Sequence, residues 1–450
     1  MSKKKQLTSL YEYSTHRFEI PLTDELALLL SRKCEELKKH FKSTILEPVH
    51  DVKSRVVGVR SFQFVGVLQI APSFSIQILP KMSNSTDDES AWQSSIQNLL
   101  YMMQYSGKLM TSQKSSSKLD SFKGDFYEIL IYLFATTLLA EVRGNLYHEY
   151  ESREQNLQFL RGKLMFSKHI LQNGVTQDKF FVSTDNFEFN NKLNIVLAYV
   201  VRMLLKETTH TRSRQILTEL SQLMGDVERT KVTTDDANRI NINRMNERFV
   251  PALNLAKLFL NNKSIKLSSS DFNTTTFLIN MNELFEDYIT AVCRKVVPQD
   301  YALKAQGPRE YLVSAHYKND PDQSQALFMM KPDISLVSTD GEKVQHIIDT
   351  KYKILEENNN RLGVSQVDMY QMYAYANKYK TKNITLLYPK RPDQDLIEAT
   401  NVIDDNCTVT VKTIDLNRDL RKCDRLIRVE VAAILNTNIN QAEPQLVAAR

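Results

Sequence analysis

Hydrophobic positions change their spacing several times along the chain, and each change predicts a different kind of element. Residues 24–41 carry apolar side chains three and four positions apart, which predicts a helix. Residues 55–80 alternate between apolar and polar positions and are rich in valine, isoleucine and phenylalanine. This alternation predicts two or three strands, with turns near 58–61 and 71–73. We therefore expect a β-rich module in the first part of the chain.

The polar segment 83–90 indicates a linker, and helical spacing dominates from there to about residue 265. Residues 156–166 depart from this spacing and predict a short strand or turn around Arg161-Gly162-Lys163. The middle of the chain is therefore expected to be mainly helical. Its predicted helices cover residues 91–105, 121–142, 190–206, 214–226 and 243–260.

From about residue 274, helical and strand patterns follow one another, an order typical of an α/β domain with helices packed on a sheet. The strands predicted at 327–338 and 343–352 are expected to pair around a turn at 339–341. The predicted helices cover 276–297, 365–380 and 420–435, and the other predicted strands cover 301–305, 383–388 and 407–416.

Together these patterns predict a mixed fold, α+β in its parts and α/β at its C-terminal end. We expect a β-containing N-terminal module over residues 1–110 and a mainly helical middle region over 111–270. An α/β domain is expected over 271–435. The polar residues 436–450 are expected to form a disordered tail.

Composition narrows the classes of function. The chain has 450 residues but only 11 glycines, whereas average usage is about 7%, and it contains no GxxxxGK[ST] phosphate loop. A nucleotide-driven motor within this chain is therefore not expected. The net charge of +5 neither requires nor excludes a nucleic-acid partner. The longest apolar stretch, residues 129–140, is shorter than the roughly 20 residues that span a bilayer, so we expect a cytoplasmic protein without a membrane segment.

Two acids and a lysine in the C-terminal region form the main candidate site. Asp333 follows Pro332, and Asp349 and Lys351 share one face of the next predicted strand because strand side chains alternate. A hairpin between the two strands brings Asp333 beside them. Paired carboxylates are hard oxygen ligands that suit Mg²⁺. A lysine beside them can orient an attacking water and offset charge on a phosphate, so the three residues suit hydrolysis of a phosphodiester.

Three further residues are candidates for supporting this site. Glu286 lies on the preceding predicted helix and could face the two acids as another ligand, directly or through a water. Gln371 and Tyr375 are four positions apart and therefore share one face of the following helix. They can support the lysine or bind a DNA backbone group. A purely structural interpretation is that Asp333 is a turn acid and that Asp349 and Lys351 form an ordinary ion pair on an edge strand.

The series PD…D-x-K…QxxxY resembles the PD-(D/E)XK nuclease superfamily, in particular its RecB-like branch. The wider chain resembles the McrC family, the nuclease subunits of McrBC modification-dependent restriction systems. The IIDTKYK and QMYAYA segments carry the most specific part of this resemblance. The matching segments are Val65–Met82, Phe159–Ile170, Ser183–Asn194, Asn282–Ile289, Met330–Leu336, Ile347–Lys353 and Gln371–Ala376.

The resemblance implies that Asp333 and Asp349 bind Mg²⁺ and that Lys351 is the catalytic lysine. It also implies a partner, a hexameric McrB-like AAA+ ring that binds and hydrolyses GTP, together with double-stranded DNA carrying modified cytosine. The N-terminal module would dock in the ring and stimulate GTP hydrolysis, with part of residues 55–80 as the docking finger. Two alternatives remain open: an adaptor that activates the ring with weak or no nuclease activity, and a nuclease of the same superfamily that acts alone.

Overall fold

The computed structural model divides the chain into two compact units. One unit combines Met1–Leu109 with Leu278–Arg450, and the other is Met110–Phe277. The three domains expected from the sequence have boundaries close to these, but the structure joins the first and last of them in one unit. The structure describes residues 6–18, 24–51, 56–71, 74–81, 89–109, 125–175, 178–263, 276–317, 320–339, 343–353, 355, 363–391, 394–404 and 407–436. The predicted linker at 83–90, apart from the start of a helix at Glu89, and the predicted disordered tail at 436–450, apart from its first residue, lie outside this set.

The N-terminal part of the first unit has two small sheets and the predicted helix α1 (Asp24–Phe41). Buried side chains of α1 and of both sheets form one hydrophobic core. The first sheet has the order β1 (Gln6–Tyr11), β6 (Phe74–Leu79), β5 (Phe64–Ala71), β10 (Thr276–Asn280), and the second has the order β2 (Thr15–Arg17), β4 (Val56–Ser61), β3 (Leu46–Asp51).

Three strands cover residues 56–79, as the alternation predicts, but the turn predicted at 58–61 is wrong. Those residues lie inside β4, and the chain leaves the strand after Ser61. Gly58 is required by packing and not by a turn, because a Cβ there would lie 2.6 Å from the carbonyl oxygen of His16 on the paired strand β2. The side chains of Phe64 and Phe74 are buried in the core.

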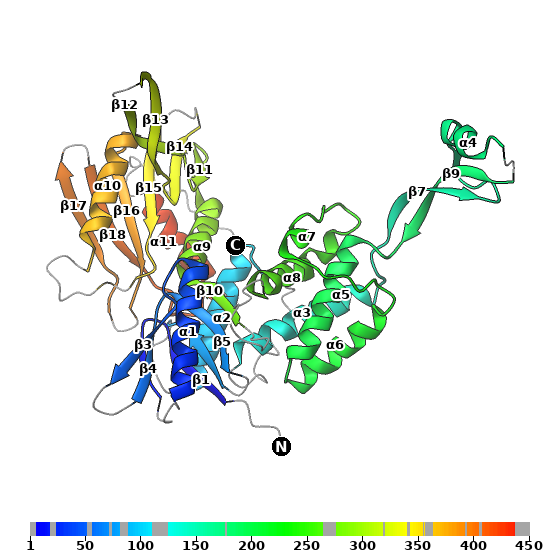
Figure 1. Cartoon of the computed structure of the whole chain (residues 1–450). Coiled ribbons are helices and arrows are strands. Elements are labelled where there is room, and N and C mark those ends of the chain that lie inside the picture. The colour runs from blue at the N-terminus through cyan, green and yellow to red at the C-terminus, as the bar shows by residue number, and fades with distance from the viewer. Residues whose placement is uncertain are drawn as a thin grey trace, which may run out of the picture. The chain divides into compact units, whose positions relative to one another are not determined.

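The C-terminal part of the first unit is a six-stranded mixed sheet with helices on both faces (Figure 1). Strands β15, β16 and β18 run parallel in its centre, and β14 pairs antiparallel with β15. The sheet order is β11 (Tyr301–Ala305), β14 (Ile334–Ser338), β15 (Val344–Thr350), β16 (Asn383–Pro389), β18 (Cys407–Ile414), β17 (Glu398–Asp404). The helices are α9 (Met281–Val296), α10 (Gln366–Tyr379) and α11 (Asp424–Asn436), and a separate hairpin pairs β12 (Glu310–Tyr317) with β13 (Asp320–Met330).

Two predicted elements of this region have different limits in the structure. The helix predicted over 276–297 begins at Met281, because the Asn280 side chain accepts a hydrogen bond from the Asn282 N–H and caps the helix there. The five residues before it form β10. The strand predicted over 327–338 is two strands in different sheets, β13 and β14, separated by Lys331, Pro332 and Asp333. Pro332 cannot donate a ladder hydrogen bond, which favours a break at this position.

Helix α2 (Glu89–Tyr105) connects the N-terminal residues to the C-terminal sheet. The buried Asn98 side chain donates to the carbonyl oxygens of Leu416 at 3.0 Å and Arg418 at 2.8 Å, and accepts from the N–H of Leu420 at 3.1 Å. Tyr101 donates to Oδ1 of Asp424 on α11 at 2.8 Å. These contacts explain why residues far apart in sequence form one unit.

The second unit contains helices and a projecting arm. The arm is a three-stranded sheet with one short helix at its end (Figure 1). Its elements are β7 (Glu149–Leu157), β8 (Lys163–Leu164), α4 (Phe166–Asn173) and β9 (Phe180–Glu188). The helices are α3 (Phe126–Val142), α5 (Lys192–Glu207), α6 (Thr211–Leu223), α7 (Thr234–Asn238), α8 (Val250–Lys263) and the 3₁₀ turn η2 (Glu247–Phe249).

The sequence prediction of a mainly helical middle region did not include the arm. Only β8 and the last two residues of β7 fall where a strand or turn is predicted, at 156–166. Strand β7 (EYESREQNL) has almost no buried residue, so it shows no alternation of apolar and polar positions. Pattern reasoning detects a strand by its buried face, and this strand has none.

The apolar stretch 129–140 lies within α3, where most of its side chains are buried. Its hydrophobicity is therefore that of a core helix. Among the described residues, no helix combines the length and the hydropathy needed to cross a membrane.

Glu128 is buried in the second unit and accepts four hydrogen bonds at the start of α6. They come from the Thr208 hydroxyl at 2.7 Å, the Thr209 N–H at 2.6 Å and hydroxyl at 3.1 Å, and the His210 N–H at 3.2 Å. A carboxylate that satisfies several donors at a helix N-terminus stabilises that end of the helix.

We expect Glu128→Leu to lower the unfolding free energy of the second unit by about 2 kcal/mol, because it leaves the N–H groups of Thr209 and His210 without their acceptor. Thermal unfolding and hydrogen exchange of the α6 amides measure this effect. The control is Glu219→Gln, which breaks the solvent-exposed ion pair with Arg143 at 2.7 Å and should cost less than about 1 kcal/mol. Equal losses in the two variants would contradict the capping role of Glu128.

Candidate active site

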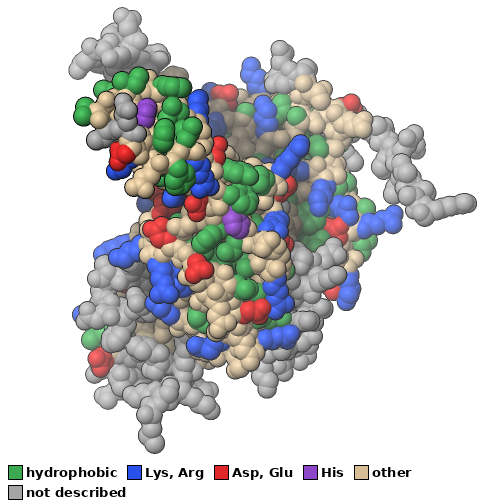
Figure 2. Space-filling view, turned by 90° about the vertical axis from the view of Figure 1, so that its right-hand side faces the viewer, with side chains coloured by type: hydrophobic (Ala, Val, Ile, Leu, Met, Phe, Trp, Pro, Cys, Tyr) green, Lys and Arg blue, Asp and Glu red, His purple; other side chains and the backbone are tan. Residues whose placement is uncertain are grey.

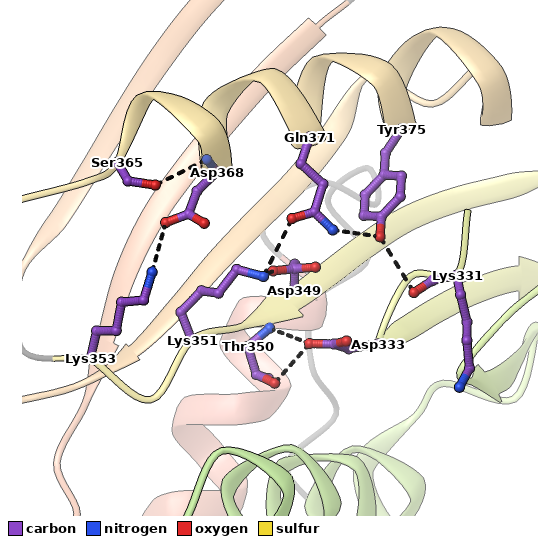
Figure 3. Close-up of polar contacts among 10 residues, drawn as sticks. All are labelled: Lys331, Asp333, Asp349, Thr350, Lys351, Lys353, Ser365, Asp368, Gln371 and Tyr375. Atoms are coloured by element: carbon purple, nitrogen blue, oxygen red, sulfur yellow. Dashed lines mark hydrogen bonds and ion pairs between the residues drawn. The ribbon is translucent and has the colours of Figure 1, made fainter. Parts of the chain in front are cut away.

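The candidate site lies where β14 and β15 pair in the centre of the six-stranded sheet. Asp333 directly precedes β14, and Ile334 pairs with Ile348, so the antiparallel register places Asp333 beside the end of β15. Oδ2 of Asp333 accepts hydrogen bonds from the N–H of Thr350 at 2.8 Å and from its hydroxyl at 2.9 Å (Figure 3). These two bonds fix the Asp333 carboxylate against the strand that carries the other candidate residues.

Asp349 is almost completely buried, with 1% of its surface exposed. It lies on the same sheet face as Ile347, the face that packs against α10. Burial raises the pKa of Asp349 to about 7, with a further contribution from the nearby Asp333 carboxylate. Burial also raises the pKa of Asp333, although the hydrogen bonds from Thr350 oppose this. The site therefore brings two carboxylates together where water does not solvate them well.

Lys351 follows the end of β15 and turns back toward Asp349. Its Nζ lies 2.6 Å from Oδ2 of Asp349 and 3.5 Å from Oε1 of Gln371. Burial alone would lower the pKa of Lys351, but the carboxylates of Asp349, Asp333 and Asp368 together outweigh this and raise it. The lysine is therefore charged, partly buried and held from two sides.

Helix α10 supplies a line of polar groups above the lysine (Figure 3). Nε2 of Gln371 donates to the Tyr375 hydroxyl at 2.8 Å, and this hydroxyl donates to the carbonyl oxygen of Lys331 at 3.3 Å. The helix begins at Gln366, after the Ser365 side chain caps the Asp368 N–H. Because Gln371 and Tyr375 are four residues apart, they reach the site from the same helix face.

Glu286 lies on α9 and is half-buried. Burial raises its pKa to about 7, and the carboxylates of Asp333, Asp287 and Asp349 contribute to the shift. The influence of Asp333 and Asp349 shows that Glu286 is electrostatically part of the same acidic site. Hydrogen bonds and an ion pair hold five of the six residues selected from the sequence together, and Glu286 is linked to them by the effect of their charges on its pKa.

Sequence reasoning missed several groups that hold these residues in place. Thr350, between Asp349 and Lys351, anchors Asp333, and the backbone of Lys331 anchors Tyr375. Lys353 forms an ion pair with Asp368 at 3.5 Å at the rim. The position of Thr350 between the acid and the lysine was a usable signal, whereas the role of a backbone carbonyl has no sequence signal.

The structural interpretation, an ordinary ion pair on an edge strand, fits the geometry poorly. An ion pair between Asp349 and Lys351 is present, but β15 lies between β14 and β16 and is not an edge strand. A buried carboxylate with a second carboxylate close by is costly for a stable fold. Such arrangements are concentrated at functional sites.

The donor set fits a magnesium ion. Asp333 and Asp349 offer hard oxygen ligands, and burial raises the pKa of each, so a bound divalent cation would favour their ionised forms. Within the described part of the chain, no three or more His, Cys, Asp and Glu side chains form a metal-binding group. Mg²⁺ usually keeps several waters and takes one or two carboxylates, so two acids suffice.

The solved structures that resemble this chain include two McrBC assemblies. A chain from the refined half-complex of a tetradecameric assembly of Thermococcus gammatolerans McrB AAA+ hexamers with bound McrC has a TM-score of 0.66 and 22% identity, and the match covers 94% of this chain and 100% of that chain. A chain from the cryo-EM structure of the Thermococcus gammatolerans McrBC complex has a TM-score of 0.52 and 25% identity, and covers 65% of this chain and 89% of that chain. No curated protein sequence matches the chain.

A family model covers most of the chain, including every residue of the candidate site. It describes a McrBC 5-methylcytosine restriction system component and matches residues 59–389. The match begins in β4 and ends with β16, so it spans parts of both compact units. The resemblance inferred from the IIDTKYK and QMYAYA segments is confirmed: the chain belongs to the McrBC 5-methylcytosine restriction system component family.

Proposed function

We propose that the chain is the DNA endonuclease subunit of a McrBC-type restriction complex and hydrolyses phosphodiester bonds with Mg²⁺. The observation that carries this proposal is the buried pair Asp333 and Asp349 with Lys351 held against it, on the central strands of a sheet. We assign the domain after residue 278 to the PD-(D/E)XK nuclease type. The order of its acid, acid, lysine and glutamine along the chain supports this assignment.

Each residue has a distinct task in this proposal. Asp333 and Asp349 would hold Mg²⁺, which supplies Lewis acidity and positive charge to the phosphate under attack. Lys351 is charged and close to Asp349, so its ammonium can orient the attacking water and donate to a phosphate oxygen. Gln371 limits the directions in which the lysine can turn.

We further propose that the chain works with a hexameric McrB-like AAA+ ring that binds GTP and with double-stranded DNA that carries modified cytosine. The similar structures contain McrB AAA+ hexamers with bound McrC, and this chain has no phosphate loop of its own. Binding of nucleotide is therefore assigned to the partner.

The end of the arm in the second unit is the surface best suited to the ring. Large apolar side chains are exposed there, with no described residue of the unit covering them, and Figure 2 shows hydrophobic side chains gathered at this end. Exposed apolar patches of this kind mark protein interaction sites. We call this set the arm tip; it consists of Phe159, Leu160, Phe166, Ile170, Leu171 and Val175.

The arm tip supports docking better than residues 55–80, from which a docking finger is expected by resemblance. The strands β5 and β6 are buried along almost their whole length. By contrast, 83% of Leu171 is exposed. A surface that contacts a partner must be accessible before binding, and among the described residues of these two regions the large exposed apolar side chains lie at the arm tip.

Reconstitution tests the proposed function. The chain is mixed with a McrB-like AAA+ GTPase, GTP, Mg²⁺ and DNA carrying 5-methylcytosine, and each component is then omitted in turn. We expect double-strand cleavage only in the complete mixture. Cleavage without partner and GTP would instead indicate a nuclease that acts alone, and stimulated GTP hydrolysis without cleavage would indicate an adaptor.

A further inference from the structure

Tyr352, the residue directly after Lys351, is held by two consecutive residues from the N-terminal part of the chain. Its hydroxyl donates to Oε1 of Glu12 at 2.6 Å, and its carbonyl oxygen accepts from the Tyr13 hydroxyl at 3.1 Å. The side chain and the backbone of Tyr352 are thus both fixed from the same turn. Since β15 ends at Thr350, these bonds hold the chain just beyond the strand.

Hydrogen bonds attach the turn at Glu12 and Tyr13 to both N-terminal sheets. The Glu12 N–H donates to the Leu79 carbonyl oxygen of β6 at 2.9 Å, and Oε1 of Glu12 also accepts from the Lys81 N–H at 2.8 Å. The Ser61 hydroxyl at the end of β4 donates to the Tyr11 carbonyl oxygen at 2.6 Å. A movement of either sheet would therefore reach Tyr352 through this turn.

The turn has two features that cost folding free energy. The Glu12 carboxyl is buried, and its Oε2 has no hydrogen-bond partner among the described residues. Tyr13 has a φ of 53°, in the left-handed region that residues other than glycine rarely adopt. Burial raises the pKa of Glu12 to about 7. Costs of this kind persist where a position serves function and not stability alone.

Tyr352 also contacts the other side of the active site. Its ring packs against Phe285 of α9, with 5.7 Å between ring centroids, and Phe285 precedes Glu286. On the opposite side of Lys351, the Lys351 N–H donates to the Leu387 carbonyl oxygen of β16 at 2.9 Å. Tyr352 is therefore the contact through which the N-terminal turn reaches the segment that carries the lysine.

We propose that Glu12 and Tyr352 are positioning residues for cleavage: their hydrogen bond fixes the backbone after Lys351, so that the lysine stays against Asp349 only while the N-terminal strands hold their place. This inference rests on the proposed nuclease function. The N-terminal strands thereby set the rate of cleavage without touching the DNA or the metal.

Three variants separate positioning from folding. Tyr352→Phe removes only the hydroxyl and keeps the ring against Phe285. Glu12→Leu fills the same buried space but cannot accept a hydrogen bond, whereas Glu12→Gln keeps the accepting oxygen. The matched control is Tyr101→Phe, which removes another tyrosine–carboxylate hydrogen bond of the same unit, the one to Asp424 at 2.8 Å.

The first measurement is hydrogen exchange of the amides of Lys351 and Lys353 in the full chain, without metal or DNA. We expect faster exchange in Tyr352→Phe and Glu12→Leu, and wild-type exchange in Glu12→Gln and Tyr101→Phe. Unchanged exchange in Tyr352→Phe and Glu12→Leu would overturn the proposal whatever the activity.

The second measurement is single-turnover cleavage in the reconstituted complex. We expect Tyr352→Phe and Glu12→Leu each to slow cleavage by about tenfold to a hundredfold, because a displacement of about 1 Å can cost about a hundredfold, with the Kd for DNA unchanged. The double variant should be no slower than the slower single variant, and Glu12→Gln should cleave like the wild type.

Cleavage at the wild-type rate by Tyr352→Phe, or slowing equal to that of Tyr101→Phe, would overturn the positioning role. The proposed nuclease function fails in a different way: the wild type does not cleave, or Asp349→Asn cleaves normally. Failure of the nuclease function would also remove the positioning role. If only the positioning role fails, the wild type still cleaves and Asp349→Asn still does not.

Discussion

Replacing Asp349 with asparagine is expected to lower the rate of DNA cleavage by at least about a thousandfold, the effect typical of losing a main electrostatic group of an active site. The amide keeps the size of the side chain but loses the negative charge that would hold Mg²⁺. It also loses the ion pair in which Nζ of Lys351 lies 2.6 Å from Oδ2 of Asp349. The measurement is single-turnover cleavage in the reconstituted complex, with Mg²⁺ binding followed by calorimetry.

The fold should survive this substitution. Asp349 is buried beside the Asp333 carboxylate, so removal of its charge relieves the repulsion between the two carboxylates. The control is Asp415→Asn, which breaks another partly buried pair of the same sheet, Lys390 with Asp415 at 3.6 Å, outside the candidate site. We expect this control to cleave at the wild-type rate. If both variants lost cleavage equally, a general disturbance of the sheet would explain the result and the role of Asp349 would be contradicted.

Polar replacement of the arm tip should separate partner binding from the nuclease site. We expect the triple variant Phe166→Gln, Ile170→Gln, Leu171→Gln to bind the AAA+ ring at least about 100-fold more weakly, because burial of each large apolar side chain contributes about 1.5–3 kcal/mol. Glutamine preserves the helical propensity of α4. These side chains are exposed in the free chain, so the substitutions should change its stability little.

Binding to the ring, measured by sedimentation, and stimulation of GTP hydrolysis report this effect. The matched control is the double variant Leu426→Gln, Val429→Gln, which changes exposed apolar residues on α11 in the other unit. If the arm variant bound the ring like the wild type and the control bound weakly, the docking surface would lie on the first unit, and its assignment to the arm tip would be contradicted.

The candidate site was predictable because its spacing is local. Asp349 and Lys351 are two positions apart on a strand, and Gln371 and Tyr375 are four apart on a helix, so each pair must share a face. The register of the hairpin then brings Asp333 to the same place. The contact of Lys351 with Gln371, 20 positions away, does not follow from this local spacing and was expected from the order of the motifs along the chain.

The contacts that support the site were not predictable in this way. Glu12 and Tyr352 are in contact although they are 340 positions apart in the sequence, and neither lies in a motif that indicates the other. The union of the N-terminal sheets with the C-terminal sheet depends on Asn98, whose partners are mainly backbone groups. Contacts of this kind arise from tertiary packing, which the pattern of a single sequence does not encode.

Strands without a buried face also escaped prediction. The sequence of β7 is polar apart from Tyr150 and Leu157, and β17 (EATNVID) lies at the edge of its sheet with a largely exposed surface. Burial, which produces the alternation of apolar and polar residues, acts weakly on both. The arm and its exposed tip therefore emerge only from the three-dimensional structure.

The most direct test of the central claim compares wild-type protein with Lys351→Met in the complete mixture of partner ring, GTP, Mg²⁺ and 5-methylcytosine DNA. Methionine keeps the length of the side chain without its charge, and the arm tip is unchanged. We predict that the wild type cleaves the DNA, whereas Lys351→Met leaves it intact while stimulating GTP hydrolysis by the ring as strongly as the wild type. Cleavage by Lys351→Met at the wild-type rate would contradict the assignment of this site as the nuclease centre.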